Sequence, residues 1–145
     1  MKRKIFSWMI LIAMTAALSA CKGAELHATV TLTEQWWSGW TEEQPEPTVK
    51  MFADVAEGTV LYDSAYDGTI TVSDVTEEAI VLQIEHSCFV EPNENGTINL
   101  GAEPVKTLTV KRGEEKKLVT QTLDAGVTLR IAYTVGNRLA GSELS

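Results

Sequence analysis

Two cysteines and two histidines are the side chains best suited to nucleophilic or metal chemistry in this chain of 145 residues. His86 and Cys88 lie two positions apart, in a run (79–90) whose apolar residues alternate as in a strand, so both are expected on its apolar face. A nucleophilic thiol needs an exposed position and a nearby base. We therefore expect Cys88 to be a buried, unreactive thiol. His27, His86 and Cys88 have no recognised ligand spacing, so neither metal nor cofactor is expected.

Motifs of known catalytic chemistry do not occur in the sequence. There is no glycine-rich phosphate loop, no Gly-x-Ser-x-Gly elbow and no His-Glu-x-x-His pair. Carboxylate pairs can always be chosen from 20 acidic residues, but no spacing singles out an acid and a base. The sequence therefore predicts that the protein is not an enzyme. An extracytoplasmic hydrolase or redox protein is the least favoured alternative.

Three of the four tryptophans, Trp36, Trp37 and Trp40, lie within five positions. In an extended strand Trp36 and Trp40 share a face and Trp37 points away, so one core cannot bury all three unless the chain bends, as Gly39 would allow. We expect at least one exposed indole. Three roles remain open: packing over a sheet edge, stacking against sugar rings or a partner, and contact with a membrane interface. These tryptophans are the candidate ligand-binding residues.

The N-terminal segment has the features of a secretory signal. Three basic residues at 2–4 precede an apolar stretch (5–18), which is too short for a membrane span, and residues 1–20 contain no acidic side chain. The segment ends in Leu18-Ser19-Ala20-Cys21, which resembles the lipobox of bacterial lipoproteins.

The resemblance to lipoproteins implies how the chain is processed and where it resides. Cleavage is expected between Ala20 and Cys21, with a diacylglycerol thioether on Cys21 and possible acylation of the new amino group, for example by palmitate. Each buried methylene contributes about 0.8 kcal/mol, so two or more acyl chains hold a protein stably. The expected location is the extracytoplasmic face of a bacterial membrane, at the cell surface or in the periplasm.

The chain is acidic once the signal is removed. Without residues 1–20, and so without their three basic side chains, nine basic residues face 20 acidic ones, a net charge of −11. Such a charge disfavours binding to nucleic acid and to anionic lipid headgroups. The lipid on Cys21 would then hold the protein at the membrane. The expected partner is an unknown envelope protein or a glycan.

From residue 26 onward the hydropathy pattern is that of strands, with a period of two. The turn 63–68 predicts a hairpin, the turn 112–115 predicts a second one, and the alternation of 127–135 predicts a central strand. The remaining expected strands are 26–33, 49–55, 79–90 and 97–100.

Seven to nine short strands predict an all-β fold of two packed antiparallel sheets, with a small barrel as the alternative. The outline resembles immunoglobulin-like sandwich domains of bacterial surface lipoproteins, and Asp124-Ala125-Gly126 resembles the corner before a late strand of such domains. Thr128 and Arg130 stand where the immunoglobulin Tyr and Cys would be.

The expected organisation has four parts. Residues 1–20 form a cleaved signal helix, 21–25 a lipidated N-terminus and short tether, 26–136 the sandwich, and 137–145 a tail. The expected function is a lipid-anchored, noncatalytic binding or accessory module. The alternative is a glycan-binding surface protein that uses the tryptophans.

Overall fold

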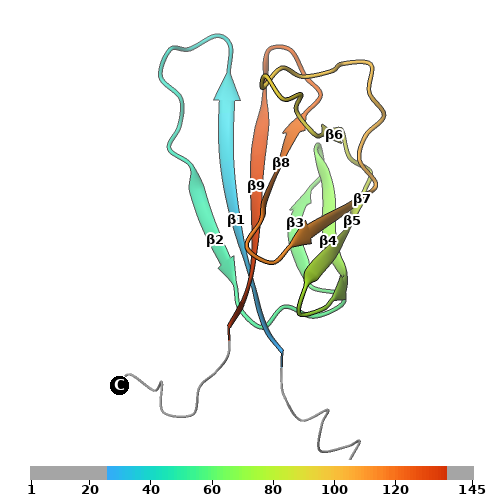
Figure 1. Cartoon of the computed structure of the whole chain (residues 1–145). Helices are drawn as coiled ribbons and strands as arrows, with labels where there is room; N and C mark the ends of the chain where they lie inside the picture. Colours follow the sequence, from blue (N-terminus) through green and yellow to red (C-terminus); the bar gives the residue numbers. More distant parts are fainter. Residues whose placement is uncertain (1–25, 137–145) are drawn as a thin grey trace, which may run out of the picture.

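The computed structural model describes residues 26–136, which form two β-sheets packed face to face (Figure 1). This range contains no helix. The predicted signal, tether and tail, with Ala20 and Cys21, lie outside the described residues. The described residues form nine strands: β1 (His27–Ser38), β2 (Thr48–Phe52), β3 (Val60–Ser64), β4 (Gly68–Val75), β5 (Ala79–Glu85), β6 (Phe89–Val90), β7 (Thr107–Lys111), β8 (Glu115–Thr120) and β9 (Ala125–Gly136).

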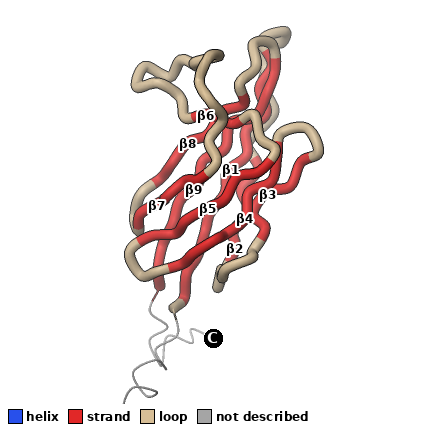
Figure 2. Tube along the Cα trace, turned by 90° about the vertical axis from the view of Figure 1, so that its right-hand side faces the viewer, coloured by secondary structure: helices blue, strands red, loops and turns tan. Residues whose placement is uncertain are grey.

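All strand pairs in the two sheets are antiparallel. The five-stranded sheet has the order β2-β1-β9-β8-β6, and the four-stranded sheet has the order β3-β4-β5-β7. Figure 2 shows the four-stranded sheet in front of the five-stranded one. The predicted sandwich is thus confirmed. The barrel alternative is wrong, because each sheet keeps two open edges.

The first and last strands form the centre of the larger sheet. β1 and β9 pair over their whole length, from His27 opposite Gly136 to Ser38 opposite Ala125. The predicted central strand at 127–135 is therefore confirmed. Because the pairing is antiparallel, β1 begins and β9 ends at the same end of the domain (Figure 1). We call this the terminal end, and the opposite end the loop end.

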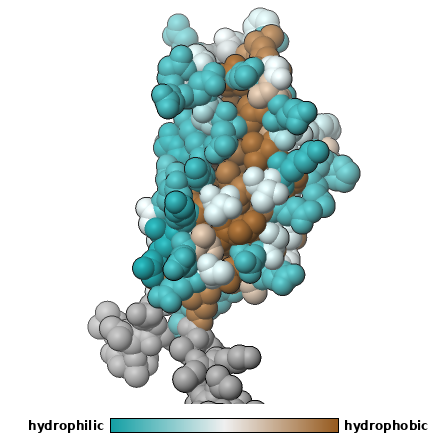
Figure 3. Space-filling model, turned by 45° about the vertical axis from the view of Figure 1, so that its right-hand side comes forward, coloured by the Kyte–Doolittle hydropathy of each residue, from teal (hydrophilic) through white to brown (hydrophobic). Residues whose placement is uncertain are grey.

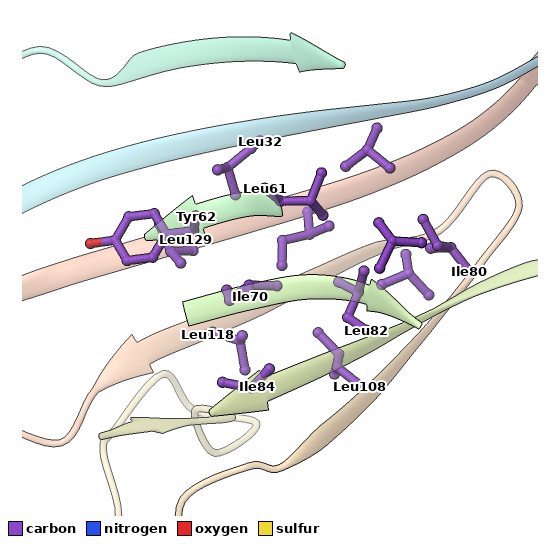
Figure 4. Packing of buried hydrophobic residues seen from close by; sticks show 14 of the residues in the cluster. Leu32, Leu61, Tyr62, Ile70, Ile80, Leu82, Ile84, Leu108, Leu118 and Leu129 are labelled. Carbon is purple, nitrogen blue, oxygen red and sulfur yellow. The ribbon is translucent and has the colours of Figure 1, made fainter. Parts of the chain in front are cut away.

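The core lies between the sheets and is built by alternation. In β1, Val30 and Leu32 are fully buried, whereas the alternating Thr29, Thr31 and Thr33 face outward. Side chains from both sheets meet in Figure 4, where Leu32 and Leu129 face Ile70 and Leu82. Burial of each such side chain contributes about 1.5–3 kcal/mol. On one side of the domain a strip of hydrophobic residues runs between hydrophilic flanks (Figure 3).

The predicted first hairpin is confirmed, and one glycine makes its turn possible. β3 pairs with β4, residues 65–67 connect the two strands, and Gly68 has a φ of 119°. Only glycine adopts this backbone without strain.

The single strand predicted at 79–90 is wrong. β5 ends at Glu85, and His86 takes a left-handed φ of 52°. The chain then crosses to the other sheet, where Phe89 and Val90 form β6 beside β8. His86 and Cys88 consequently do not continue the buried face of β5.

The predicted second hairpin is also wrong. β7 pairs with β5 and β8 pairs with β9, so the turn at 112–114 carries the chain from one sheet to the other. Residues 97–100 form no strand and belong to the connection between β6 and β7.

The run predicted at 49–55 is shorter and faces the other way. β2 ends at Phe52 and forms an edge of the sheet, with Val49 and Met51 exposed on the outer face. Lys50 and Phe52 take the inner positions opposite Leu32 and Val30. An edge strand has one neighbour and an open side, so its apolar alternation need not mark the core.

Candidate functional site

The tryptophans lie where β1 passes into the connection to β2, at the loop end of the domain. The side-chain amide of Gln44 fixes this connection. Its Nε2 donates to the carbonyls of Ser38 and Thr41, and its Oε1 accepts from the Ser38 N–H, each at 2.8 Å. Gln35 Nε2 donates to the Pro45 carbonyl. The side chains of this segment, which we call the tryptophan loop (residues 36–47), are therefore displayed from an ordered backbone.

The three indoles have different surroundings. Trp36 is 49% exposed and Trp40 is 79% exposed, as expected for at least one indole. Trp37 is half-buried on the outer face of β1, with its ring over Gly126 of β9, where no side chain intervenes. Trp36 and Trp37 thus point to opposite faces, as predicted. Trp40 lies beyond β1 in a turn that includes Gly39, so the chain bends where the sequence allowed a bend, and Trp40 does not continue the strand face of Trp36.

Two hollows meet at Trp36. The first, of about 500 Å³, lies within the tryptophan loop, and its lining includes Trp37, Glu43 and Pro45. The second, of about 620 Å³, lies where the edge strands β2 and β3 leave the sandwich open. We call the second hollow the seam groove. Its lining residues are Glu34, Trp36, Lys50, Phe52 and the segment 60–66.

A carboxylate occupies a core-facing position in the seam groove. Glu34 follows Val30 and Leu32 in the inward alternation of β1, and its side chain is only 12% exposed. Lys50 Nζ, on the neighbouring strand, lies 3.6 Å from Glu34 Oε2. The strand alternation alone would have revealed Glu34, because the residue two positions after a buried leucine is expected on the same face.

A neutral phenol also lines the groove. Tyr62 is 6% exposed, and its hydroxyl donates to Asp67 Oδ2 at 3.0 Å. Burial raises the pKa of Tyr62 well above the ordinary value for a phenol, and the hydrogen bond to Asp67 raises it further. The Tyr62 hydroxyl is thus un-ionised at neutral pH and committed to Asp67.

The tryptophans are close to Cys21 in sequence but lie at the loop end of the domain. β1 has 12 residues and begins at the terminal end, so at about 3.3 Å per residue it carries the chain about 36 Å along the domain. Nearness in sequence therefore does not support the membrane-interface role considered for these indoles.

The cysteine and histidines do not converge. Cys88 is a free thiol among the described residues and is partly exposed, so its predicted burial is wrong; it lies outside β5, in the crossover. His86 is exposed beside it. His27 instead contacts Asp54, with 2.8 Å between Nδ1 and Oδ1. Within residues 26–136, no three His, Cys, Asp or Glu side chains are grouped so that they could hold a metal ion.

Comparisons with protein-family models, with curated proteins and with solved structures gave no match. In the described range no helix is long and apolar enough to cross a membrane. The case for a function therefore depends on the sequence motif at Cys21 and on the surfaces at the loop end.

Proposed function

We propose that the protein is a lipid-anchored, noncatalytic binding or accessory module of a bacterial envelope or cell surface. The observation that carries the proposal is that the first strand begins at one end of the domain and the tryptophan loop lies at the opposite end. β1 begins at the terminal end, directly after the segment with the lipobox-like motif, and the fixed tryptophan loop lies at the other end. A domain attached in this way presents its loop end away from the attachment point.

The anchor is tested by intact mass and membrane fractionation of the full chain expressed in a bacterial host. The expected product begins at Cys21, carries a diacylglycerol-type adduct and sediments with membranes. Cys21→Ala is expected to remain unprocessed and without lipid, whereas the matched control Cys88→Ala is processed like the wild type. A normally lipidated Cys21→Ala product would refute the anchoring proposal.

A second candidate function is glycan binding at the tryptophan loop. The exposure of Trp36 and Trp40 favours it, because exposed flat rings on an ordered backbone can stack against sugar rings without loss of a folded contact. The test is a panel of immobilised glycans probed with the full chain and with a variant in which Trp36, Trp37 and Trp40 are all alanine. Loss of retention is expected; unchanged retention of the variant would remove this candidate.

A further inference from the structure

We propose that the seam groove binds a neutral saccharide, with Trp36 and Tyr66 against its rings and Glu34 and Lys50 hydrogen-bonded to its hydroxyl groups. The proposal rests on the second candidate function and locates its site. Of the three tryptophans, only Trp36 lines this groove, and Tyr66, Glu34 and Lys50 are not among the candidate ligand-binding residues suggested by the sequence.

The dimensions and lining of the groove suit a small polar ligand. Its volume of about 620 Å³ lies within the usual range for ligand sites, and its surface is mostly apolar with a few charged groups. Phe52 and Leu61 contribute apolar surface, and the charged groups are Glu34 of β1, Lys50 of β2 and Asp63 of β3. A saccharide has the matching character, since its rings have apolar faces and its edges bear hydroxyls.

Tyr66 is an exposed aromatic ring on a fixed turn. It is 93% exposed, and no core contact explains an aromatic residue there. Its turn is held by Ser64, whose Oγ accepts from the N–H groups of Tyr66 and Asp67 and donates to Asp67 Oδ2. With Trp36, which is 49% exposed, Tyr66 gives the groove two accessible aromatic rings.

Glu34 has hydrogen-bonding capacity that the described residues do not use. Its side chain is 12% exposed, and its oxygens reach the solvent of the groove, because no buried side-chain oxygen among the described residues lacks a hydrogen-bond partner. Among the described residues its one charged partner is Lys50 at 3.6 Å, and no donor lies within hydrogen-bonding distance of its side chain. Glu34 can therefore accept from ligand hydroxyls, while the ammonium group of Lys50 can donate to them.

The charges around the groove select against anionic ligands. Glu34 and Lys50 offset one another, so the groove suits an uncharged polar molecule. Asp63 in the lining and the acidic residues of the tryptophan loop leave the surrounding surface negative, and this field repels saccharides with carboxylates. The loop residues concerned are Glu42, Glu43 and Glu46.

The experiment uses the full chain in a detergent without a sugar headgroup. It is applied to an array of neutral, amino-sugar and uronic-acid oligosaccharides, and the best neutral ligand is then titrated calorimetrically. Trp36→Ala and Tyr66→Ala are each expected to weaken binding about tenfold, and Glu34→Gln about fivefold. Trp40→Ala, in the tryptophan loop, distinguishes the two candidate sites. The matched controls Leu123→Ala and Glu78→Gln, exposed residues outside both hollows, are expected to stay within about twofold. Tyr66→Ala is expected to fold because Tyr66 is exposed, and Glu34→Gln because it preserves the shape of the side chain. Thermal unfolding checks the folding of both variants.

The outcomes separate this proposal from the one on which it rests. Binding of a neutral saccharide that is lost with Tyr66→Ala and kept with Trp40→Ala supports the seam groove. Binding that is lost with Trp40→Ala and kept with Tyr66→Ala overturns the groove and leaves glycan binding at the tryptophan loop. A preference for uronic acids or amino sugars overturns the neutral ligand. Retention of no saccharide by the wild type overturns both proposals, although lipid anchoring would stand.

Discussion

Two features of the structure require glycine at position 68: a positive φ and the close approach of residues 85 and 87. The φ of Gly68 is 119°, and a Cβ built there would lie 2.6 Å from Ser87 Cβ and 2.8 Å from the Glu85 carbonyl oxygen. Gly68→Ala is therefore expected to lower the free energy of unfolding by about 2–4 kcal/mol, measured by chemical denaturation.

Gly96 provides the matched control for Gly68. It has a φ of 81°, but a Cβ there would meet nothing within 4 Å. Gly96→Ala is expected to cost only about 1 kcal/mol, the cost of backbone strain alone. If both variants lost the same free energy of unfolding, the contact with Ser87 would not contribute to the cost of a side chain at residue 68.

Gly126 makes room for the ring of Trp37. A Cβ at this position would clash most closely with Thr120 Oγ1, and it would also lie 2.7 Å from Thr122 Oγ1 and 2.8 Å from Trp37 Cζ2. Gly126→Ala is expected to lower the free energy of unfolding by about 1–3 kcal/mol and to change the Trp37 fluorescence. The control is Gly101→Ala, where the nearest atom, Asn99 Oδ1, is 3.5 Å away. A Gly126→Ala variant as stable as the control would contradict the packing described.

Between the sheets, one hydrogen bond links the central strand to the opposite layer. The hydroxyl of Tyr133 in β9 donates to the carbonyl of Thr76, in the turn between β4 and β5, at 2.6 Å. Tyr133→Phe is expected to lower the free energy of unfolding by about 1 kcal/mol, because the ring stays in place and only the hydrogen bond is lost. Urea unfolding of wild type and variant measures this difference. Thr134→Val, an exposed change on the same strand, serves as the control, and an equal loss there would argue against the link.

Strand alternation predicted the elements that lie within a sheet. The alternating apolar residues of 127–135 revealed β9, since the opposite sheet covers one face of this central strand. The same reasoning failed for Val49 and Met51, because an edge strand can turn apolar residues to solvent. Alternation identifies a strand, but the face it buries depends on neighbours that the local sequence does not specify.

Crossings between sheets were not predictable from the local pattern. The strand at 79–90 breaks at His86, whose left-handed backbone has no strong signal in a histidine. The turn at 112–114 reads as a hairpin, yet β7 and β8 find partners in different sheets. The seam groove could not be predicted for the same reason. Glu34 and Tyr66 meet in its lining only because β2, the neighbour of β1, and β3 are edge strands at the same open side.

The stability of the whole domain is expected to depend on pH in the alkaline range, because two of its tyrosines are buried. Burial raises the pKa of both Tyr62 and Tyr133 in the folded state. A raised pKa means that the folded state holds its proton more tightly than the unfolded chain does. The associated stability is complete below about pH 10, the ordinary value for a phenol, and is lost as the pH rises above it.

This linkage predicts a fall in unfolding temperature above pH 10. Differential scanning calorimetry between pH 8 and pH 11 would measure the fall, and it should be smaller in Tyr133→Phe, which has one linked phenol fewer. Tyr66→Phe removes the hydroxyl of an exposed tyrosine and is the control, with a fall equal to that of the wild type. An unfolding temperature that does not change across this range would contradict the linkage.

The pairing of β1 with β9 also governs when the domain can fold. Of the nine described strands, β9 at the middle of the larger sheet is the last to be synthesised, so β1 has no permanent neighbour on that side until residues 125–136 have been made. Contacts between residues so far apart in sequence form slowly. Before β9 has been made, the larger sheet lacks its middle strand, and an incompletely folded chain is the state that a secretion channel requires. In the exported protein proposed here, the fold itself would delay folding until translocation has ended.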